Sequence, residues 1–299
     1  MTREVGIFEG IRSGRRDFLA TAGMAVAALA AGRGAAAQEP GPAKAGTRKP
    51  AARPPLELGL ASYTLRKFTL DQTLAMTQRV GLKYLCLKSF HLPLDAKPEE
   101  IAAAVAKVKA AGLVLYGCGV VSMGKPADVD QAFDYAKAAG MKTIVASPKP
   151  ELLPLVDKKV RQDDIQVAIH NHGPGDKIYP TPQSIYEKVQ GLDKRIGICM
   201  DIGHTLRIGA DPIESALKYA DRLLDVHIKD VSAADPKGQT VEVGRGVIDI
   251  PGFLRALLKI KYCGIVSFEH EKDEKDPLAG LAESVGYVRG VLAVLGETP

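Results

Sequence analysis

Eight short apolar segments alternate with longer amphipathic segments from Leu56 onward, and this alternation restricts the fold more than any other feature of the sequence. The apolar segments have the length and aliphatic content of buried strands. They span residues 57–62, 84–88, 113–120, 143–147, 165–170, 196–201, 224–229 and 265–269. Strands that alternate with helix-sized segments indicate a parallel sheet, because each connection must return the chain to the same end of the sheet.

The segments between these strands have helical patterns with recognisable ends. Helices are predicted at 98–111, 126–140, 212–223, 251–261 and 277–295. Several begin near a proline and two end at a glycine (Gly112 and Gly140), which is typical of first helical turns and of C-terminal caps. Eight such strand–helix units in about 240 residues match the size of a (β/α)8 barrel. We therefore predict a single-domain α/β protein with a TIM-barrel fold over residues 56–296.

A doubly wound open sheet is the alternative architecture. Such sheets usually carry a G-x-G-x-x-G turn directly after the first strand. Here the first strand is followed by Ser62-Tyr-Thr-Leu65, and Gly244-Arg245-Gly246 occurs too late in the chain to serve as that turn. The sequence therefore favours the closed barrel.

The N-terminal region has the features of an export signal. Gly14-Arg15-Arg16-Asp-Phe-Leu19 precedes an uncharged run that ends at Gly32, and Ala35-Ala36-Ala37 provides an A-x-A cleavage site. The paired arginines indicate the twin-arginine pathway; an ordinary signal or an uncleaved anchor are the alternatives. We predict a signal peptide at 1–37 and a disordered, Pro- and Ala-rich linker at 38–55. The mature protein would be periplasmic or secreted, without stable membrane insertion.

Charge and cysteine content limit the partners of the mature chain. Residues 1–37 contain five Lys or Arg and three Asp or Glu, so their removal changes the net charge from +5 to +3. With no basic run in the remainder, nucleic acid is not an expected partner. The four cysteines (Cys86, Cys118, Cys199 and Cys263) show no metal-site spacing, and we predict that they are buried free thiols.

Polar and ionisable residues gather at the ends of the last four predicted strands. These ends read His170-Asn171-His172, Asp201-Ile-Gly-His204, His227-Ile-Lys229-Asp230 and Glu269-His270-Glu271. Five of the six histidines of the chain fall in these four places. Catalytic groups of (β/α)8 barrels lie at the carboxyl ends of the strands, so these side chains are expected to share one rim.

One residue from each strand end gives a set of two imidazoles and two carboxylates, namely His170, Asp201, His227 and Glu269. Taken singly, each has a simpler explanation as a hydrogen-bonded loop residue, a helix cap or a solvated turn. Together in a partly dry pocket they are costly unless a cation is bound. The donor set suits Mn, Fe, Co or Zn better than ions that prefer only oxygen. We expect one divalent ion, with manganese preferred and cobalt, iron, zinc or magnesium as alternatives.

These strand-end motifs, together with Gly244-Arg245-Gly246 and Ser267-Phe268-Glu269, resemble those of the xylose isomerase-like TIM-barrel superfamily of sugar phosphate isomerases and epimerases. The resemblance covers Leu56 to about Leu295. It implies a metal held by Glu, Asp, His and Glu at strands five to eight. Asp201, His227 and Glu269 match the last three positions, whereas His170 stands where the familiar pattern has glutamate.

The resemblance also implies roles for individual residues. Glu269 would be the base that removes a proton, and His170 would be either a ligand or a second base. His172 and His204 would contact substrate. Arg245 would contact a sugar oxygen or a charged group, unless it is simply an exposed turn residue. Lys229 would stabilise an oxyanion, or else pair with Asp230.

The function implied by the resemblance is a metal-dependent isomerase or epimerase that acts next to the carbonyl of a sugar or keto-sugar. A dehydratase or lyase of a keto-sugar or 3-keto-glycoside is the alternative, because histidine at position 170 weakens a two-carboxylate proton exchange. A non-catalytic sugar-binding barrel is a third reading. DNA repair, known for relatives of this fold, is disfavoured by the small net charge. The expected partner is a small sugar, and the sequence is also compatible with a homo-oligomer.

Overall fold

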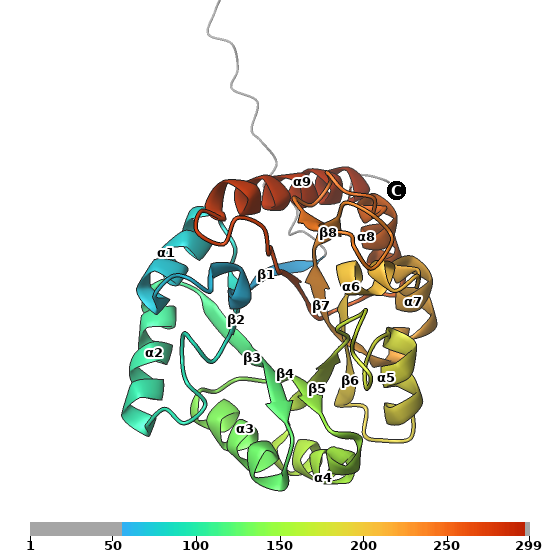
Figure 1. Ribbon diagram of the computed structural model, residues 1–299. Coiled ribbons are helices and arrows are strands. Elements are labelled where there is room, and N and C mark those ends of the chain that lie inside the picture. Colours follow the sequence, from blue (N-terminus) through green and yellow to red (C-terminus); the bar gives the residue numbers. More distant parts are fainter. Residues whose placement is uncertain (1–55, 297–299) are drawn as a thin grey trace, which may run out of the picture. The chain divides into compact units, whose positions relative to one another are not determined.

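The computed structural model describes residues 56–296, and in this range the eight predicted strands close into one parallel barrel (Figure 1). Its strands are hydrogen-bonded in the order β1-β10-β7-β6-β5-β4-β3-β2. Their bounds are β1 Glu57–Ala61, β2 Tyr84–Leu87, β3 Val114–Met123, β4 Thr143–Pro148, β5 Gln166–His170, β6 Ile196–Asp201, β7 Leu223–Ile228 and β10 Ile265–Phe268. The predicted (β/α)8 fold is confirmed. The predicted signal peptide (1–37) and linker (38–55) lie outside the described residues and stay predictions.

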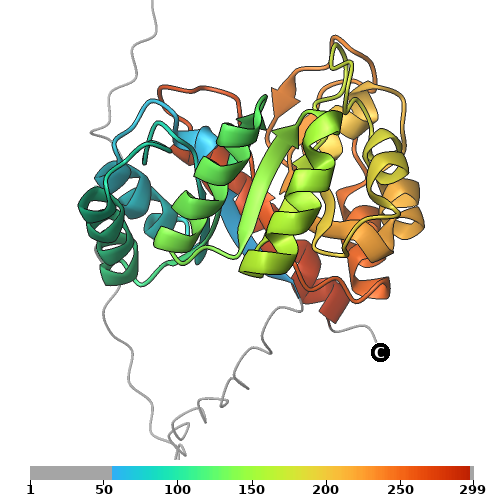
Figure 2. The same cartoon turned by 90° about the horizontal axis from the view of Figure 1, so that it is seen from below.

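The helices form a ring around the barrel, seen down its axis in Figure 1 and from the side in Figure 2. They are α1 Leu70–Arg79, α2 Pro98–Ala110, α3 Pro126–Ala138, α4 Leu153–Asp163, α5 Pro182–Val189, α6 Ile202–Arg207, α7 Pro212–Lys218, α8 Ile250–Lys259 and α9 Leu278–Gly296. Short 3-10 turns occur at η1 Ser62–Leu65, η2 Pro150–Leu152 and η3 Ala220–Arg222, and a small antiparallel pair is formed by β8 Asp230–Val231 and β9 Thr240–Val241.

One predicted helix is shorter than expected. The pattern at 212–223 predicts a continuous helix, but α7 ends at Lys218 and β7 already begins at Leu223. The 3-10 turn η3 follows α7 and ends at Arg222, whose side chain is 1% exposed. Its guanidinium donates hydrogen bonds to the backbone carbonyls of Gln190, Leu192, Asp193 and Ile196. A buried cation needs such partners, and these contacts hold Arg222 at the point where the chain enters β7.

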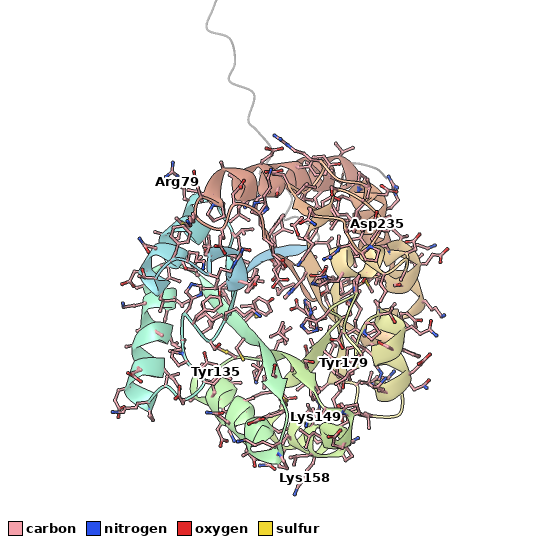
Figure 3. All side chains as sticks on the ribbon, viewed as in Figure 1. Arg79, Tyr135, Lys149, Lys158, Tyr179 and Asp235 are labelled. Atoms are coloured by element: carbon pink, nitrogen blue, oxygen red, sulfur yellow. The ribbon has the colours of Figure 1, made fainter. Side chains whose placement is uncertain are left out.

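Side chains pack between the barrel and the helix ring, whereas charged residues such as Arg79 and Lys158 point to the outside (Figure 3). Tyr135 and Tyr179 are both buried, and their hydroxyl groups donate to the backbone carbonyls of Leu92 and Pro148. The polar ends of these two aromatic side chains are therefore satisfied inside the otherwise mostly aliphatic core.

The last helix, α9, completes the ring. Within the described residues it is the one helix long and apolar enough to cross a membrane by length and composition. A closing core helix passes the same test, and one face of α9 packs into the barrel through Leu281, Val285, Val288 and Leu292. This packing accounts for the buried face of α9 only, because 28% of its apolar window is buried and Tyr287 and Val294 are exposed.

The four cysteines are free thiols, as predicted. Cys86 and Cys199 are buried in one small cluster with Val145 and Ala168, and Cys118 is buried in the main hydrophobic core. The prediction of burial is wrong for Cys263, which is exposed. It lies in the turn between α8 and β10, before the chain enters the barrel.

Candidate metal centre

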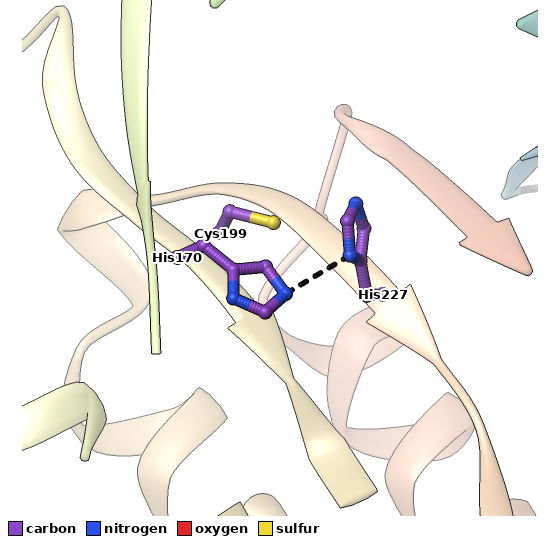
Figure 4. A group of neighbouring side chains, drawn as sticks. All are labelled: His170, Cys199 and His227. Atoms are coloured by element: carbon purple, nitrogen blue, oxygen red, sulfur yellow. Dashed lines mark hydrogen bonds between the residues drawn. The ribbon is translucent and has the colours of Figure 1, made fainter. Parts of the chain in front are cut away.

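Four side chains converge at the carboxyl ends of β5, β6, β7 and β10, and we call them the His-Asp-His-Glu cluster (His170, Asp201, His227 and Glu269). The exposed fraction of each is 4% or less. His170 Nε2 lies 3.1 Å from His227 Nδ1 (Figure 4) and 3.6 Å from Asp201 Oδ2. Glu269 Oε2 lies 3.2 Å from His227 Nδ1 and 3.9 Å from His170 Nε2. The structure therefore brings together the four residues that the sequence proposed as ligands.

Asn171 fixes the first two members of the cluster relative to each other. Its amide nitrogen donates to the backbone carbonyl of Asp201 and to Thr205 Oγ1, and its amide oxygen accepts from the Asp201 backbone N–H. The Oδ1 atom of Asp201 in turn accepts from the backbone N–H of His204 and so caps α6. The His-Asn-His motif thus combines a candidate ligand with the residue that ties the end of β5 to β6.

Lys229 places its ammonium group inside the same region. Its Nζ atom lies 2.8 Å from Asp201 Oδ2 and 2.9 Å from Glu269 Oε2, and it also contacts Glu271. The stem of Lys229 passes directly over Gly203, where an added Cβ would lie 2.5 Å from Lys229 Cγ. Only glycine at position 203 leaves room for the lysine to reach both carboxylates.

The local charges set the protonation states of the cluster. Burial lowers the pKa of His170 to about 3, so its imidazole is neutral and retains a lone pair. Burial alone would raise the pKa of Glu269, but Lys229 and His227 outweigh it and hold that pKa well below its usual range. The pKa of Asp201 is likewise lowered, against burial, by His204 and Lys229. At neutral pH the carboxylates of Asp201 and Glu269 are therefore ionised, and neutral His170 has a lone pair available for a metal ion.

This donor set fits a divalent cation. One ligand atom from each of the four residues lies within 4.8 Å of all the others. Three carboxylates, from Asp201, Glu269 and Glu271, face one ammonium, and the two remaining negative charges equal the charge of one divalent ion. Among the described residues, His170 Nδ1 is buried without a hydrogen-bond partner, whereas Asp201 Oδ2 contacts the Lys229 ammonium at 2.8 Å. Buried polar atoms without partners are rare unless they have a ligand to bind.

Replacing Lys229 by Met is expected to destabilise the metal-free protein by about 3–5 kcal/mol, because two buried carboxylates lose their cation. Manganese should restore most of the loss, since a bound divalent ion takes over the compensating charge. Urea unfolding with and without manganese measures both effects.

The control for this variant is Lys272→Met. Lys272 also pairs with a carboxylate, that of Glu242, but its side chain is 39% exposed. Its loss should destabilise the protein far less than Lys229→Met does, because solvent screens an exposed ion pair, and manganese should have no effect. Equal losses for the two variants, or no rescue of Lys229→Met by manganese, would contradict the assigned charge balance.

The two predicted substrate-contact histidines lie beside the cluster. The ring of His172 is 4.6 Å from that of His170, and the ring of His204 is 6.0 Å from it. His172 is 38% exposed in its side chain and pairs with Asp176, whereas His204 keeps a buried Nδ1 atom without a partner in the described part of the chain. Both are therefore next to the candidate metal centre, with His172 on its solvent side.

Arg245 is not brought to the cluster. Its side chain is 62% exposed and its guanidinium pairs with Glu283 of α9. The flanking loop folds onto Asp230, whose Oδ2 atom accepts from the backbone N–H groups of Gly244 and Gly246 at 3.0 Å each. An added Cβ at Gly246 would lie 2.1 Å from Asp230 Oδ1. The glycines thus serve a tight turn whose amides bind Asp230, and that carboxylate does not pair with Lys229.

A buried carboxyl group that the sequence analysis left without a role lies below His227. Asp225 is 1% exposed, accepts from the Tyr116 hydroxyl at 3.3 Å, and has its Oδ2 atom 3.9 Å from His227 Nε2. Tyr116 also contacts Ser267 Oγ at 2.7 Å. The spacing of Asp225 two residues before His227, on the same face of β7, was the available signal. The sequence contains no comparable signal for Tyr116, which lies on β3 on the opposite side of the barrel.

Asp225 predicts a pH-dependent stability of the metal-free protein. Burial raises its pKa from 3.8 to about 6, so between these values the folded state binds more protons than the unfolded chain. The contribution of Asp225 to stability therefore falls as pH rises through this window and is lowest above pH 6. Asp225→Asn cannot ionise, so its stability relative to wild type should rise by about 3 kcal/mol between pH 4 and pH 8. Urea unfolding in chelator at both pH values tests this, and a constant difference would contradict it.

Fold and cluster together define a (β/α)8 barrel with a candidate cation site at the carboxyl ends of its strands. Residues 51–291 match the family model described as xylose isomerase-like TIM barrel, and the chain belongs to this family. The family prediction made from the strand-end motifs is confirmed.

Two curated relatives resemble part of the chain. The rhizopine catabolism protein MocC of Rhizobium meliloti is 27% identical over 134 residues, covering 40% of this chain and 41% of the relative. The inosose dehydratase of Geobacillus kaustophilus is 27% identical over 161 residues, covering 47% and 52%. The chain thus matches about half the length of each relative or less.

Solved structures with the same fold include both epimerase and zinc-binding proteins. An L-ribulose 3-epimerase aligns at 16% identity over 81% of this chain and 98% of its own, with a TM-score of 0.66. The IolI protein with a bound zinc atom aligns at 17% identity over 81% and 100%, with a TM-score of 0.65. At these identities the similarity establishes the barrel fold.

Proposed function

We propose that the chain is a divalent-metal-dependent enzyme that removes a proton next to the carbonyl of a sugar or keto-sugar. The observation that carries the proposal is the convergence of the His-Asp-His-Glu cluster, whose four ligand atoms lie within 4.8 Å of one another in a buried site. Two similarities support this reaction class: an L-ribulose 3-epimerase has a similar fold, and an inosose dehydratase has a similar sequence.

The residues of the site can divide the chemistry between them. His170 Nε2, Asp201 Oδ2, His227 Nδ1 and Glu269 Oε2 would hold the ion, which when bound polarises a carbonyl and favours the adjacent anion. Glu269 is ionised and can accept a proton on its other oxygen. The ammonium of Lys229, whose pKa is raised by Asp201 and Glu269 against the effect of burial, can donate a hydrogen bond to a developing oxyanion.

Dehydration is the second candidate, and the observation that favours it is the neutral His170 in place of a second carboxylate. An epimerase needs a base on each face of the anion, whereas an elimination needs one base and one acid. Glu269 would take the proton from carbon, and the electron pair left there would expel a hydroxyl group at the neighbouring carbon. Lys229 would protonate this group so that it leaves as water.

One experiment separates these functions. Manganese-loaded protein is incubated in deuterated water with sugars, keto-sugars, 3-keto-glycosides and inosose, and the products are followed by NMR. Deuterium uptake with the carbon skeleton and hydroxyl groups retained indicates isomerisation or epimerisation. Formation of a product that has lost water indicates dehydration. Saturable binding without any exchange or turnover would reject both and leave a sugar-binding barrel.

Replacing His170 by Glu should shift the chemistry toward epimerisation. The variant places a second carboxylate opposite Glu269, so deuterium exchange into the substrate is expected to rise about tenfold relative to dehydration. NMR product ratios measure the change. His170→Gln, which has the same length without the charge, is the control and should show no gain. An unchanged ratio in the glutamate variant would mean that residue 170 does not face the reacting carbon.

A further inference from the structure

A second, softer set of metal donors shares both histidines with the cluster. One ligand atom each of His170, Cys199 and His227 lies within 4.8 Å of the others, and Figure 4 shows the three side chains facing one another. All three are at least 98% buried. Cys86 and Cys118 are also buried thiols, but neither belongs to such a group within residues 56–296.

The position of Cys199 follows from strand register. Cys199 precedes Asp201 by two residues, so both side chains point to the same side of β6 and Cys199 lies one layer deeper in the barrel. Its Cα is paired with that of His170 on the neighbouring strand β5. The imidazole of His170 can therefore serve the carboxylate layer above or the thiol layer below.

The two layers differ in the cations that they suit. The upper layer adds the carboxylates of Asp201 and Glu269, which are hard donors that both contact the Lys229 ammonium. The lower layer adds a sulfur atom, a soft donor that selects thiophilic ions. Among the described residues, His170 Nδ1 and His227 Nε2 have no hydrogen-bond partner although both rings are buried, so each imidazole has unused binding capacity.

We propose that His170, Cys199 and His227 form an alternative site for thiophilic cations such as Cd²⁺ or Zn²⁺, in which the carboxylates of the cluster stay paired with Lys229. On binding, a metal–sulfur bond replaces the S–H bond and the thiol proton passes to solvent. The carboxylate of Asp225, with its Oδ2 atom 3.7 Å from Cys199 Sγ, adds a second negative charge beside the thiolate and so balances the divalent ion. Because the two modes share both histidines, a soft ion excludes manganese and inhibits the enzyme.

The site is tested on the chelator-treated, full-length chain. Cd²⁺ titration should produce the near-ultraviolet absorption of a cadmium thiolate, and the X-ray absorption spectrum of the zinc form should contain one sulfur neighbour at about 2.3 Å. Cys199→Ser should abolish both signals and weaken Cd²⁺ binding by about tenfold or more. The matched control Cys86→Ser, another buried barrel thiol, should keep them.

Mn²⁺ binding, measured by electron paramagnetic resonance, separates this inference from the proposed function. The inference rests on the proposed function only because the two sites share His170 and His227. Mn²⁺ affinity should be unchanged in Cys199→Ser, whereas Cd²⁺ should displace Mn²⁺ from wild type. A thiolate signal that persists in Cys199→Ser, or a zinc shell of nitrogen and oxygen only, overturns the soft site. Cys199→Ala gives the same comparison if the serine variant does not fold. If the wild-type protein binds no Mn²⁺ but still gives the cadmium thiolate signal, the proposed function alone is overturned.

Discussion

Replacing Asp201 by Asn is expected to weaken manganese binding by about a hundredfold or more and to lower turnover by about a thousandfold. Asparagine keeps the shape of the side chain and can still cap α6 by accepting from the His204 backbone N–H, as Asp201 Oδ1 does at 2.7 Å. What it removes is the negative charge at Oδ2, which faces both His170 and Lys229. Isothermal titration with manganese and NMR turnover assays measure the two losses.

Asp211→Asn is the matched control for this variant. Asp211 also caps a helix, accepting from the backbone N–H groups of Ile213 and Glu214, but it lies at the exposed start of α7. The substitution there should leave manganese binding and turnover unchanged. If Asp201→Asn bound manganese as tightly as wild type, Asp201 would be a helix cap only, and the His-Asp-His-Glu cluster would lose its assigned role.

The barrel and the membership of the cluster could be predicted from sequence because both depend on short-range patterns. Apolar segments of strand length locate the strands, and parallel strands bring their carboxyl ends to one rim. His170 and Asp201 end their strands, Glu269 directly follows β10 and His227 is the last residue but one of β7, so their convergence required no knowledge of packing. The same reasoning explains why the family resemblance rested on these four places.

The roles of Lys229 and Arg245 depended on contacts between segments far apart in the chain. Lys229 could have paired with its neighbour Asp230, yet its ammonium reaches Asp201 and Glu269 instead. Asp230 is occupied by the amides of Gly244 and Gly246, and Arg245 pairs with Glu283, 38 residues further on. Sequence spacing alone does not indicate which of several nearby charges a flexible side chain will meet.

The depth of buried groups was equally inaccessible to sequence reasoning. Cys199 and Asp225 appear in the sequence as ordinary members of apolar strands. The structure shows that Cys199 lies within reach of two imidazoles and of the Asp225 carboxylate. The register of adjacent strands places Cys199 of β6 beside His170 of β5 and Asp225 of β7, and the apolar pattern of the sequence does not reveal this register.

Replacing Glu269 by Gln is expected to lower deuterium exchange at the carbon next to the carbonyl by about a thousandfold, while manganese binding falls much less. Glutamine keeps one oxygen donor for the ion but cannot accept the proton. The pKa of Glu269 is held low by Lys229 and His227 against burial, so wild type should retain its base through the acidic range and lose activity only where this carboxylate is protonated. NMR in deuterated water, read beside manganese titrations, separates the two functions of the side chain.

Glu271→Gln distinguishes loss of the base from loss of charge. Glu271 shares the Lys229 ammonium with Glu269 but its side chain is 30% exposed and is not a member of the cluster. If Glu269 acts only by balancing charge, the two glutamine variants should slow exchange to a similar extent. If Glu269 is the base, Glu271→Gln should retain exchange within about tenfold of wild type, because the base remains and only the environment of Lys229 changes. Exchange that survives in Glu269→Gln but is lost in Glu271→Gln would transfer the role of base to Glu271.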